Sequence, residues 1–155
     1  KNFECSAGPI FVSADTNQLR QAFLNIFLNA IEAMPSGGSL TVATRVSRKS
    51  PACRQGRYLV NRNEIRNTND EQREADFVEI SFTDTGVGIP SKDIKHIFDP
   101  FYTTKDHGTG LGLSITQKIV QEHNGKMWAE SEAGKGTRFV VEMPVAEERN
   151  EVKSE

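Results

Sequence analysis

The longest periodic pattern in the chain lies in residues 15–34, DTNQLRQAFLNIFLNAIEAM. Apolar side chains recur there at intervals of three and four residues, as they do on the buried face of a helix. Asp15 stands where an N-cap is expected, and PSGG at 35–38 ends the pattern, so we predict one long helix. Its inward positions are Leu19, Ala22, Phe23, Ile26, Ala30 and Ala33.

Two later segments alternate between apolar and polar positions, which predicts strands. The first, SLTVATRV (39–46), is rich in β-branched residues, and the second, FVEISFTD (77–84), ends at Asp84. The stretch KMWAES-EAGKG-TRFVVEMP (126–144) contains two alternating runs on either side of turn residues. It predicts a β-hairpin.

Two segments between the second strand and the hairpin carry other signals. SKDIKHIF (91–98) is expected to form a short helix that ends near Asp99, because Pro100 disfavours helical geometry at the residue before it. FYTTKDHGTGLG (101–112) has the composition of a flexible loop.

A second long helix is predicted over SITQKIVQEHNG (114–125), with Ile115, Ile119 and Val120 facing inward and Gly125 as its stop. The resulting order of elements does not follow the regular βαβ alternation of a doubly wound sheet. We therefore expect an α+β domain, a two-layer α/β sandwich. Its sheet is expected to be mixed and mostly antiparallel, with three main helices on one face.

Composition and charge narrow the class of protein. The chain has 155 residues, a net charge of −2 and no apolar run near the roughly 20 residues that span a bilayer. A domain without a cationic surface is not expected to bind nucleic acid, and we expect a cytoplasmic domain without direct membrane contact. Cys5 and Cys53 lack the spacing of a metal site and are expected to be unpaired thiols.

The predicted domain covers residues 1–146, with an insertion at 47–76 and a charged, disordered tail at 147–155. The insertion is longer than the two to five residues that a hairpin connection usually needs. We interpret it as a tolerated insertion, and a contact with a partner or sensor through its arginines stays open.

A narrow polar stripe runs along the first predicted helix and contains Gln18, Gln21, Asn25, Asn29 and Glu32. Asparagine disfavours helix by up to about 0.7 kcal/mol relative to alanine, so two of them one turn apart need an explanation. Either their amides satisfy buried backbone groups, or Asn29 offers an oxygen to a hard cation such as Mg²⁺. The helix alone does not decide.

The segment GTGLGLS (108–114) is a glycine-rich loop that runs into a predicted helix N-terminus. Free N–H groups and the helix dipole at such a place attract anions, which suits a phosphate chain. The loop lacks the Gly-Lys-Ser/Thr end of a P-loop and the preceding strand of a dinucleotide-binding motif. By itself it is equally explained as a flexible linker.

A third candidate is DTGVGIP (84–90), where the predicted strand delivers Asp84 beside Gly86 and Gly88. Backbone without Cβ atoms allows close approach of another group. A carboxylate accepts a hydrogen bond from the exocyclic amine of adenine, whereas the carbonyl of guanine would repel it. The alternative is an Asx-type turn in which Asp84 bonds its own backbone.

Taken together, these motifs resemble those of a known family. N-x-x-x-N, D-x-G-x-G, FDPFYTTK, G-x-G-x-G and GKGTRF occur in this order. The arrangement resembles the ATP-binding catalytic domain of sensor histidine kinases, within the wider group that includes the ATPase domains of DNA gyrase, heat-shock chaperones and mismatch repair. The resemblance covers about residues 11 to 144, and NAIEAMPSGG looks like the nitrogen-regulation type of sensor kinase.

The resemblance implies a role for each motif. It assigns Mg²⁺ binding to Asn29 and places Asn25 beside the phosphates, where it takes part in catalysis. It assigns adenine recognition to Asp84, with Gly86 and Gly88 allowing the ring to approach.

It also implies a mobile ATP lid. Phe98 and Phe101 match an aromatic box at the hinge of the lid, and Thr104 and Lys105 follow it, Lys105 as a catalytic contact of the γ-phosphate. Thr137 matches a threonine near the adenine pocket. The second glycine box, around the phosphates, consists of Gly108, Thr109, Gly110, Leu111, Gly112 and Leu113.

One position separates two reaction types within this group. Relatives that hydrolyse ATP carry a glutamate one turn before the metal-binding asparagine, and this chain has Asn25 there. An amide does not accept a proton at neutral pH, so phosphoryl transfer to an outside nucleophile is favoured over hydrolysis. This chain also departs from many histidine kinases at Glu32, where they have a Lys or Arg.

Three alternatives to a histidine kinase stay open: a gyrase-type ATPase, an anti-sigma-type serine kinase and a nucleotide-sensing module.

The expected acceptor is a histidine, and none of the three in the chain lies in a phosphoacceptor motif. His96, His107 and His123 are interpreted as ordinary surface or lid side chains. The resemblance places the acceptor on a helical dimerisation domain before Lys1, of the same chain or of a dimer mate, with a response regulator as the next partner.

Overall fold

The described part of the computed structural model comprises residues 2–4, 10–47, 77–105 and 108–146. Most of the predicted insertion, the predicted tail, both cysteines and His107 lie outside these ranges. The elements in chain order are β1 (Asn2–Glu4), α1 (Thr16–Glu32), β2 (Leu40–Ser47), β3 (Phe77–Asp84), α2 (Gly112–Glu122), β4 (Lys126–Glu132) and β5 (Gly136–Pro144). Neither described helix has the length and apolarity required to cross a bilayer.

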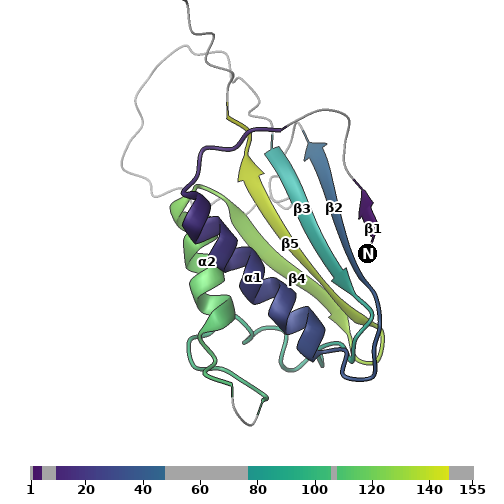
Figure 1. The fold of residues 1–155 in the computed structure, drawn as a ribbon. Helices are drawn as coiled ribbons and strands as arrows, with labels where there is room; N and C mark the ends of the chain where they lie inside the picture. Colours follow the sequence, from purple (N-terminus) through teal and green to yellow (C-terminus); the bar gives the residue numbers. More distant parts are fainter. Residues whose placement is uncertain (1, 5–9, 48–76, 106–107, 147–155) are drawn as a thin grey trace, which may run out of the picture.

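The strands form one sheet in the order β1-β2-β3-β5-β4. Only the short β1 runs parallel to its neighbour, and the other three pairings are antiparallel. Both helices lie across the same face of this sheet, as Figure 1 shows. The predicted α+β class, with a mixed and mostly antiparallel sheet and helices on one face, is confirmed.

Helix α1 begins at the predicted cap. One carboxylate oxygen of Asp15, Oδ1, accepts the N–H groups of Asn17 and Gln18 at 2.8 and 3.0 Å. These bonds, that of Gln18 first, hold the pKa of Asp15 below its ordinary value of 3.8. The cap is therefore fully effective above that value, and its contribution is lost as the pH falls through the lowered pKa.

The core lies between α1, α2 and the helix-facing side of the sheet. Ala22, Ile26 and Ala30 of α1 are buried, as their spacing predicts. Phe82 of β3 packs between two rings of α1, with centroids 5.5 Å from Phe23 and 5.3 Å from Phe27. The central strand and the long helix are thus fixed against each other, and they place the ends of both elements at the same edge of the domain.

The region of the predicted short helix differs from the expectation. Residues 91–98 form successive turns, so the described residues contain two helices and not three. Asp93, His96 and Asp99 donate their N–H groups to carbonyls three residues earlier, which is tighter than an α-helix. Only nine residues separate Pro90 from Pro100, which is too short a stretch to repay the cost of helix nucleation.

Helix α2 also differs in which residues it buries. Ile119 and Val120 are buried as predicted, but Ile115 is 37% exposed and Thr116 takes the inward place. Ile115 lies about 100° around the helix from Thr116, at the edge of the buried face. The hydroxyl of Thr116 donates to the carbonyl of Gly112 at 2.8 Å, which removes the cost of burying it.

The end of α2 does not use Gly125 in the way the sequence suggests. Asn124 takes the left-handed conformation, with φ 58°. Gly125 follows it, and a Cβ atom there would lie 2.6 Å from the carbonyl oxygen of Glu142 in β5. Gly125 is therefore required by the close approach of β5 and not by a positive φ.

His123 ties the two helices together and is not an ordinary surface side chain. Its Nδ1 lies 2.7 Å from the carbonyl of Ile119, and its Nε2 accepts the N–H of Asp15 at 3.0 Å. The ring therefore carries its proton on Nδ1 in this arrangement. The end of α2 is joined in this way to the first residue before α1.

We expect His123→Ala to lower the free energy of unfolding by about 1 kcal/mol, because one backbone donor loses its acceptor at a partly exposed place. Urea denaturation measures this. The matched control is His96→Ala, since the His96 side chain is exposed and its hydrogen bond is to the exposed carboxylate of Asp99. Its ring also lies 5.8 Å from that of Tyr102, but it accepts no backbone N–H in the described residues. Equal stabilities of the two variants would contradict the assigned role.

Candidate nucleotide-binding site

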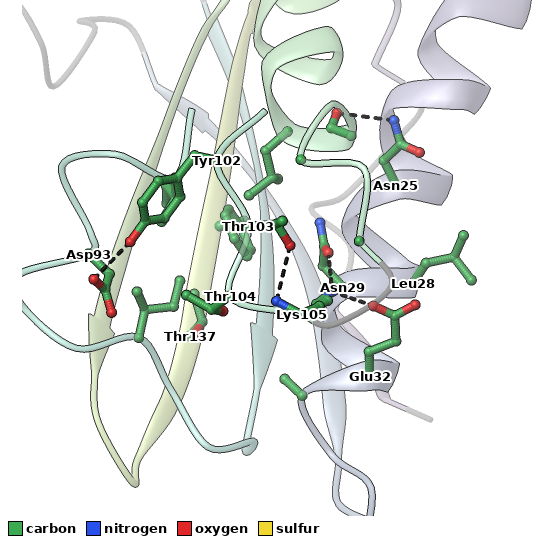
Figure 2. A pocket seen from close by; sticks show the side chains of 18 of the residues that line it. Asn25, Leu28, Asn29, Glu32, Asp93, Tyr102, Thr103, Thr104, Lys105 and Thr137 are labelled. Carbon is green, nitrogen blue, oxygen red and sulfur yellow. Dashed lines mark hydrogen bonds and ion pairs between the residues drawn. The ribbon is translucent and has the colours of Figure 1, made fainter. Parts of the chain in front are cut away.

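One cavity of about 530 Å³ lies at the edge where α1, the end of β3, the segment before α2 and the first turn of α2 meet. It brings together twelve of the sequence-predicted site residues, several of which are labelled in Figure 2. These are Asn25, Asn29, Asp84, Gly88, Thr104, Lys105, Gly108, Thr109, Gly110, Gly112, Leu113 and Thr137. Four others, Gly86, Phe98, Phe101 and Leu111, are not among the residues that line it.

Asp84 ends β3 at the wall of this cavity and is only 3% exposed. Its Oδ1 accepts the N–H of Gly86 at 2.8 Å and the N–H of Thr137 at 3.2 Å. The first bond is the Asx-type turn that the sequence left open as an alternative. Within the described ranges both hydrogen bonds to this carboxylate end on Oδ1, so Oδ2 is the oxygen left for a donor inside the cavity.

The two glycines after Asp84 are packed against the protein's own backbone. A Cβ atom on Gly86 would lie 2.5 Å from the carbonyl oxygen of Ala33, at the end of α1. One on Gly88, which has φ 68°, would lie 2.1 Å from the carbonyl oxygen of Glu132 in β4. These glycines fix the loop between α1 and the β4–β5 hairpin, and Gly88 also lines the cavity.

Asn25 connects α1 to α2. Its Nδ2 donates to the carbonyl of Gly112 at 3.2 Å and to the hydroxyl oxygen of Thr116 at 3.3 Å. One of the two explanations for the asparagine stripe, that an amide satisfies polar groups of the fold, therefore applies to Asn25. The bond from Asn25 to Gly112 also holds the start of α2 at the cavity wall.

Asn29 lies one turn further along α1 and holds a cationic group. The ammonium of Lys105 donates to Asn29 Oδ1 at 2.8 Å and to a carboxylate oxygen of Glu32. Figure 2 shows the three side chains converging at the mouth of the cavity. Lys105 and Glu32 are 44% and 55% exposed, so water still reaches this ion pair.

The segment that contains Lys105 is closed at its base by a backbone pair. The N–H of Phe101 donates to the carbonyl of Gly110 at 2.9 Å. Phe101 has φ 66° and its side chain is 75% exposed, whereas Phe98 packs against the core. Phe98 and Phe101 of the predicted aromatic box therefore stand at the N-terminal end of this loop and are not among the residues that line the cavity.

Among the wall residues that the sequence reasoning did not assign to the site, two polar ones bond each other. The hydroxyl of Tyr102 donates to Asp93 Oδ1 at 2.8 Å, and both residues line the cavity. The bond stabilises the neutral phenol and raises the pKa of Tyr102 above its ordinary value of 10.0. Tyr102 lies inside the quoted FDPFYTTK motif and was within reach of motif reasoning, but nothing in the local pattern marked Asp93.

Comparison with known proteins identifies the family of this fold. Residues 14–147 match the model of the family described as histidine kinase-, DNA gyrase B- and HSP90-like ATPases. The chain belongs to this ATPase family.

Relatives of this ATPase-family domain are sensor kinases. Sporulation kinase E of Bacillus subtilis (strain 168) is 40% identical over 144 residues, which is 91% of this chain and 16% of that protein. The chain thus spans about a sixth of that relative's length.

Solved structures with a similar fold include histidine kinases. The catalytic domain of histidine kinase ThkA is 32% identical with a TM-score of 0.64, covering 92% of this chain and 76% of that one. Full-length ShkA in complex with AMPPNP is 25% identical with a TM-score of 0.65, covering 93% of this chain and 25% of that one.

Proposed function

We propose that this domain binds Mg·ATP in the described cavity and donates the γ-phosphoryl group to a histidine on a separate helical domain. A response regulator would then receive the phosphoryl group in two-component signalling. One observation carries the proposal: a single cavity has a buried carboxylate with one oxygen to spare at one end and a cation-holding asparagine at the other. The complex of the related ShkA with AMPPNP, an ATP analogue, supports the choice of ligand.

The base end of the cavity fits adenine. Asp84 has Oδ1 fixed by two backbone N–H groups, so its Oδ2 keeps a constant position for the exocyclic amine. Thr137 beside it is buried, and its hydroxyl lies 2.9 Å from that of Ser131. The base would meet a preformed acceptor, and little ordering would be needed on binding.

The other end fits a phosphate chain. The glycine-rich loop leads directly into α2, which begins at Gly112, and no side chain caps its first turn. The free N–H groups and dipole of that turn favour anions. Gly108 and Gly110 line the cavity just before it.

The donor set also fits a hard cation. Asn29 Oδ1 holds the ammonium of Lys105, and a neutral amide oxygen of this kind is a ligand that Mg²⁺ accepts together with phosphate oxygens. Mg²⁺, when bound, neutralises charge on the transferring phosphate. Asn29 would hold it.

The proposed reaction moves one phosphoryl group. The bond between the γ-phosphorus and the bridging oxygen of ADP breaks, a bond to an imidazole nitrogen of the acceptor forms, and that imidazole gives up its proton. Lys105 would contact the γ-phosphate and orient it. Asn25 offers no base for water, because its amide cannot take a proton and its NH₂ group bonds Gly112 and Thr116.

The direct test incubates the purified chain with γ-labelled ATP and Mg²⁺, alone and with histidine-bearing helical acceptor domains. We expect acid-labile label on an acceptor and none on this chain. Stable label on the chain itself, or on serine of an acceptor, would contradict the proposal. Binding of labelled ATP without transfer to any acceptor would identify a nucleotide sensor instead.

The reaction type gives a further prediction. Asn25→Glu places a carboxylate where a base could activate water, and we expect release of free phosphate to rise by roughly tenfold, below the 10²–10⁴-fold of a well-placed base. A coupled phosphate assay measures it. Asn25→Gln is the control, because it changes the side-chain length without adding a base. Fast hydrolysis by the unchanged chain would favour a gyrase-type ATPase.

A further inference from the structure

The contact between Lys105 and Glu32 joins residues that are 73 positions apart in the chain. Lys105 belongs to the loop between Phe101 and Gly110, and Glu32 is the last residue of α1. The same ammonium is also held by Asn29 Oδ1, one turn earlier on α1. The loop that carries the proposed phosphate contact is therefore docked on α1 by one cationic group with two oxygen partners.

Charge decides which of these partners can stay when a nucleotide enters. A triphosphate brings several negative charges to the same end of the cavity, and the carboxylate of Glu32 repels them. The γ-phosphate carries more negative charge than one carboxylate, so it competes with Glu32 for the Lys105 ammonium, which now donates to Glu32 and Asn29. Repulsion between the two anions favours replacement of Glu32 by the phosphate.

We propose that Glu32 is a positioning residue for Lys105. It holds the ammonium beside Asn29 in the domain without nucleotide and passes it to the γ-phosphate by exchange of anionic partners. This inference rests on the proposed function, because it needs the γ-phosphate at that end of the cavity. It also gives a role to Glu32, which stands where many histidine kinases have a Lys or Arg: Glu32 on α1 positions Lys105 of the loop.

The strength of the pair suits exchange. Both side chains are about half exposed, and exposed ion pairs contribute little because water and salt screen them. The weak pair with Glu32 therefore favours the docked position of Lys105, and a more highly charged anion such as the γ-phosphate can still replace Glu32.

The test begins with the domain free of nucleotide. Glu32→Gln should speed hydrogen exchange of amides in peptides that span Thr103 to Leu113, by about two- to fivefold, as expected for the loss of one exposed pair. In a Lys105→Gln background the same change should have no further effect. Glu122→Gln is the matched control: it removes an equal charge from an exposed pair with Lys118 on α2.

The second measurement is affinity for ATP and ADP by calorimetry, with Mg²⁺ present. Glu32→Gln should tighten ATP binding by about two- to fivefold and change ADP binding less, because the competition for Lys105 involves the γ-phosphate. A side chain that merely supports the fold would not separate the two nucleotides. Unchanged loop exchange, or an ATP affinity that is unchanged or weaker, would overturn the proposal.

The two proposals fail in different ways. Loop exchange in the nucleotide-free domain does not depend on any phosphoryl transfer, so it can support the contact even if no acceptor is ever labelled. If the unchanged chain does not bind ATP, the proposed function fails first, and the exchange of Lys105 to a γ-phosphate fails with it.

Discussion

Asp84→Asn is expected to weaken binding of ATP and ADP by roughly tenfold to a hundredfold, measured by calorimetry at neutral pH. A hydrogen bond to a charged group contributes about 1.5–3 kcal/mol, and an Asn whose Oδ1 is held by the backbone would turn its NH₂ group, a repelling donor, toward the adenine amine. The fold should tolerate the change, because Asn Oδ1 still accepts the N–H groups of Gly86 and Thr137 that now bond the carboxylate.

Two controls make the result specific. Asp99→Asn changes the same group at an exposed pair with His96. The Asp99 side chain does not line the cavity, so this change should leave nucleotide affinity unchanged. GTP should gain relative to ATP in Asp84→Asn, since an amide NH₂ can donate to the carbonyl of guanine. Unchanged affinity for both adenine nucleotides would show that Asp84 does not contact the base.

Local periodicity was sufficient to predict the elements that build the cavity. The 3.6-residue pattern predicted α1 and its cap at Asp15, and strict alternation predicted β3 up to Asp84 and the β4–β5 hairpin. These signals arise because one face of each element must be buried. The motifs then placed twelve of the predicted site residues around one cavity.

Predictions that depended on long-range contacts were less successful. His123 contacts Asp15 across 108 positions, and Lys105 contacts Glu32 across 73. No spacing rule links residues so far apart, because the contact exists only after the sheet has placed both helices on one face. The exposure of Ile115 is also decided by packing and not by the local pattern.

The glycines of the first box show how one pattern can have two physical causes. The sequence suggested that a ligand approaches them, and Gly88 does line the cavity. The atoms that fill the place of each Cβ, however, are carbonyl oxygens of Ala33 and Glu132. The loop needs residues without Cβ atoms because it runs in close contact with the end of α1 and with β4. The position of Asp84 depends on this path of the loop.

Gly88→Ala is therefore expected to lower the free energy of unfolding by about 2–5 kcal/mol. Gly88 has φ 68°, and a left-handed conformation of this kind costs alanine about 1–2 kcal/mol. Its Cβ would also lie 2.1 Å from the carbonyl oxygen of Glu132, and forced overpacking adds about 1–3 kcal/mol. Urea denaturation at neutral pH measures the loss.

The hairpin supplies a matched control in Gly134→Ala. Gly134 also has a positive φ, 82°, but no atom lies within 4 Å of the place of its Cβ, so only the conformational cost of about 1–2 kcal/mol applies. The difference between the two variants isolates the close approach of the loop to β4. If both variants lose the same stability, the contact with Glu132 does not constrain Gly88, and the glycine would then be explained by its conformation and its place in the cavity wall.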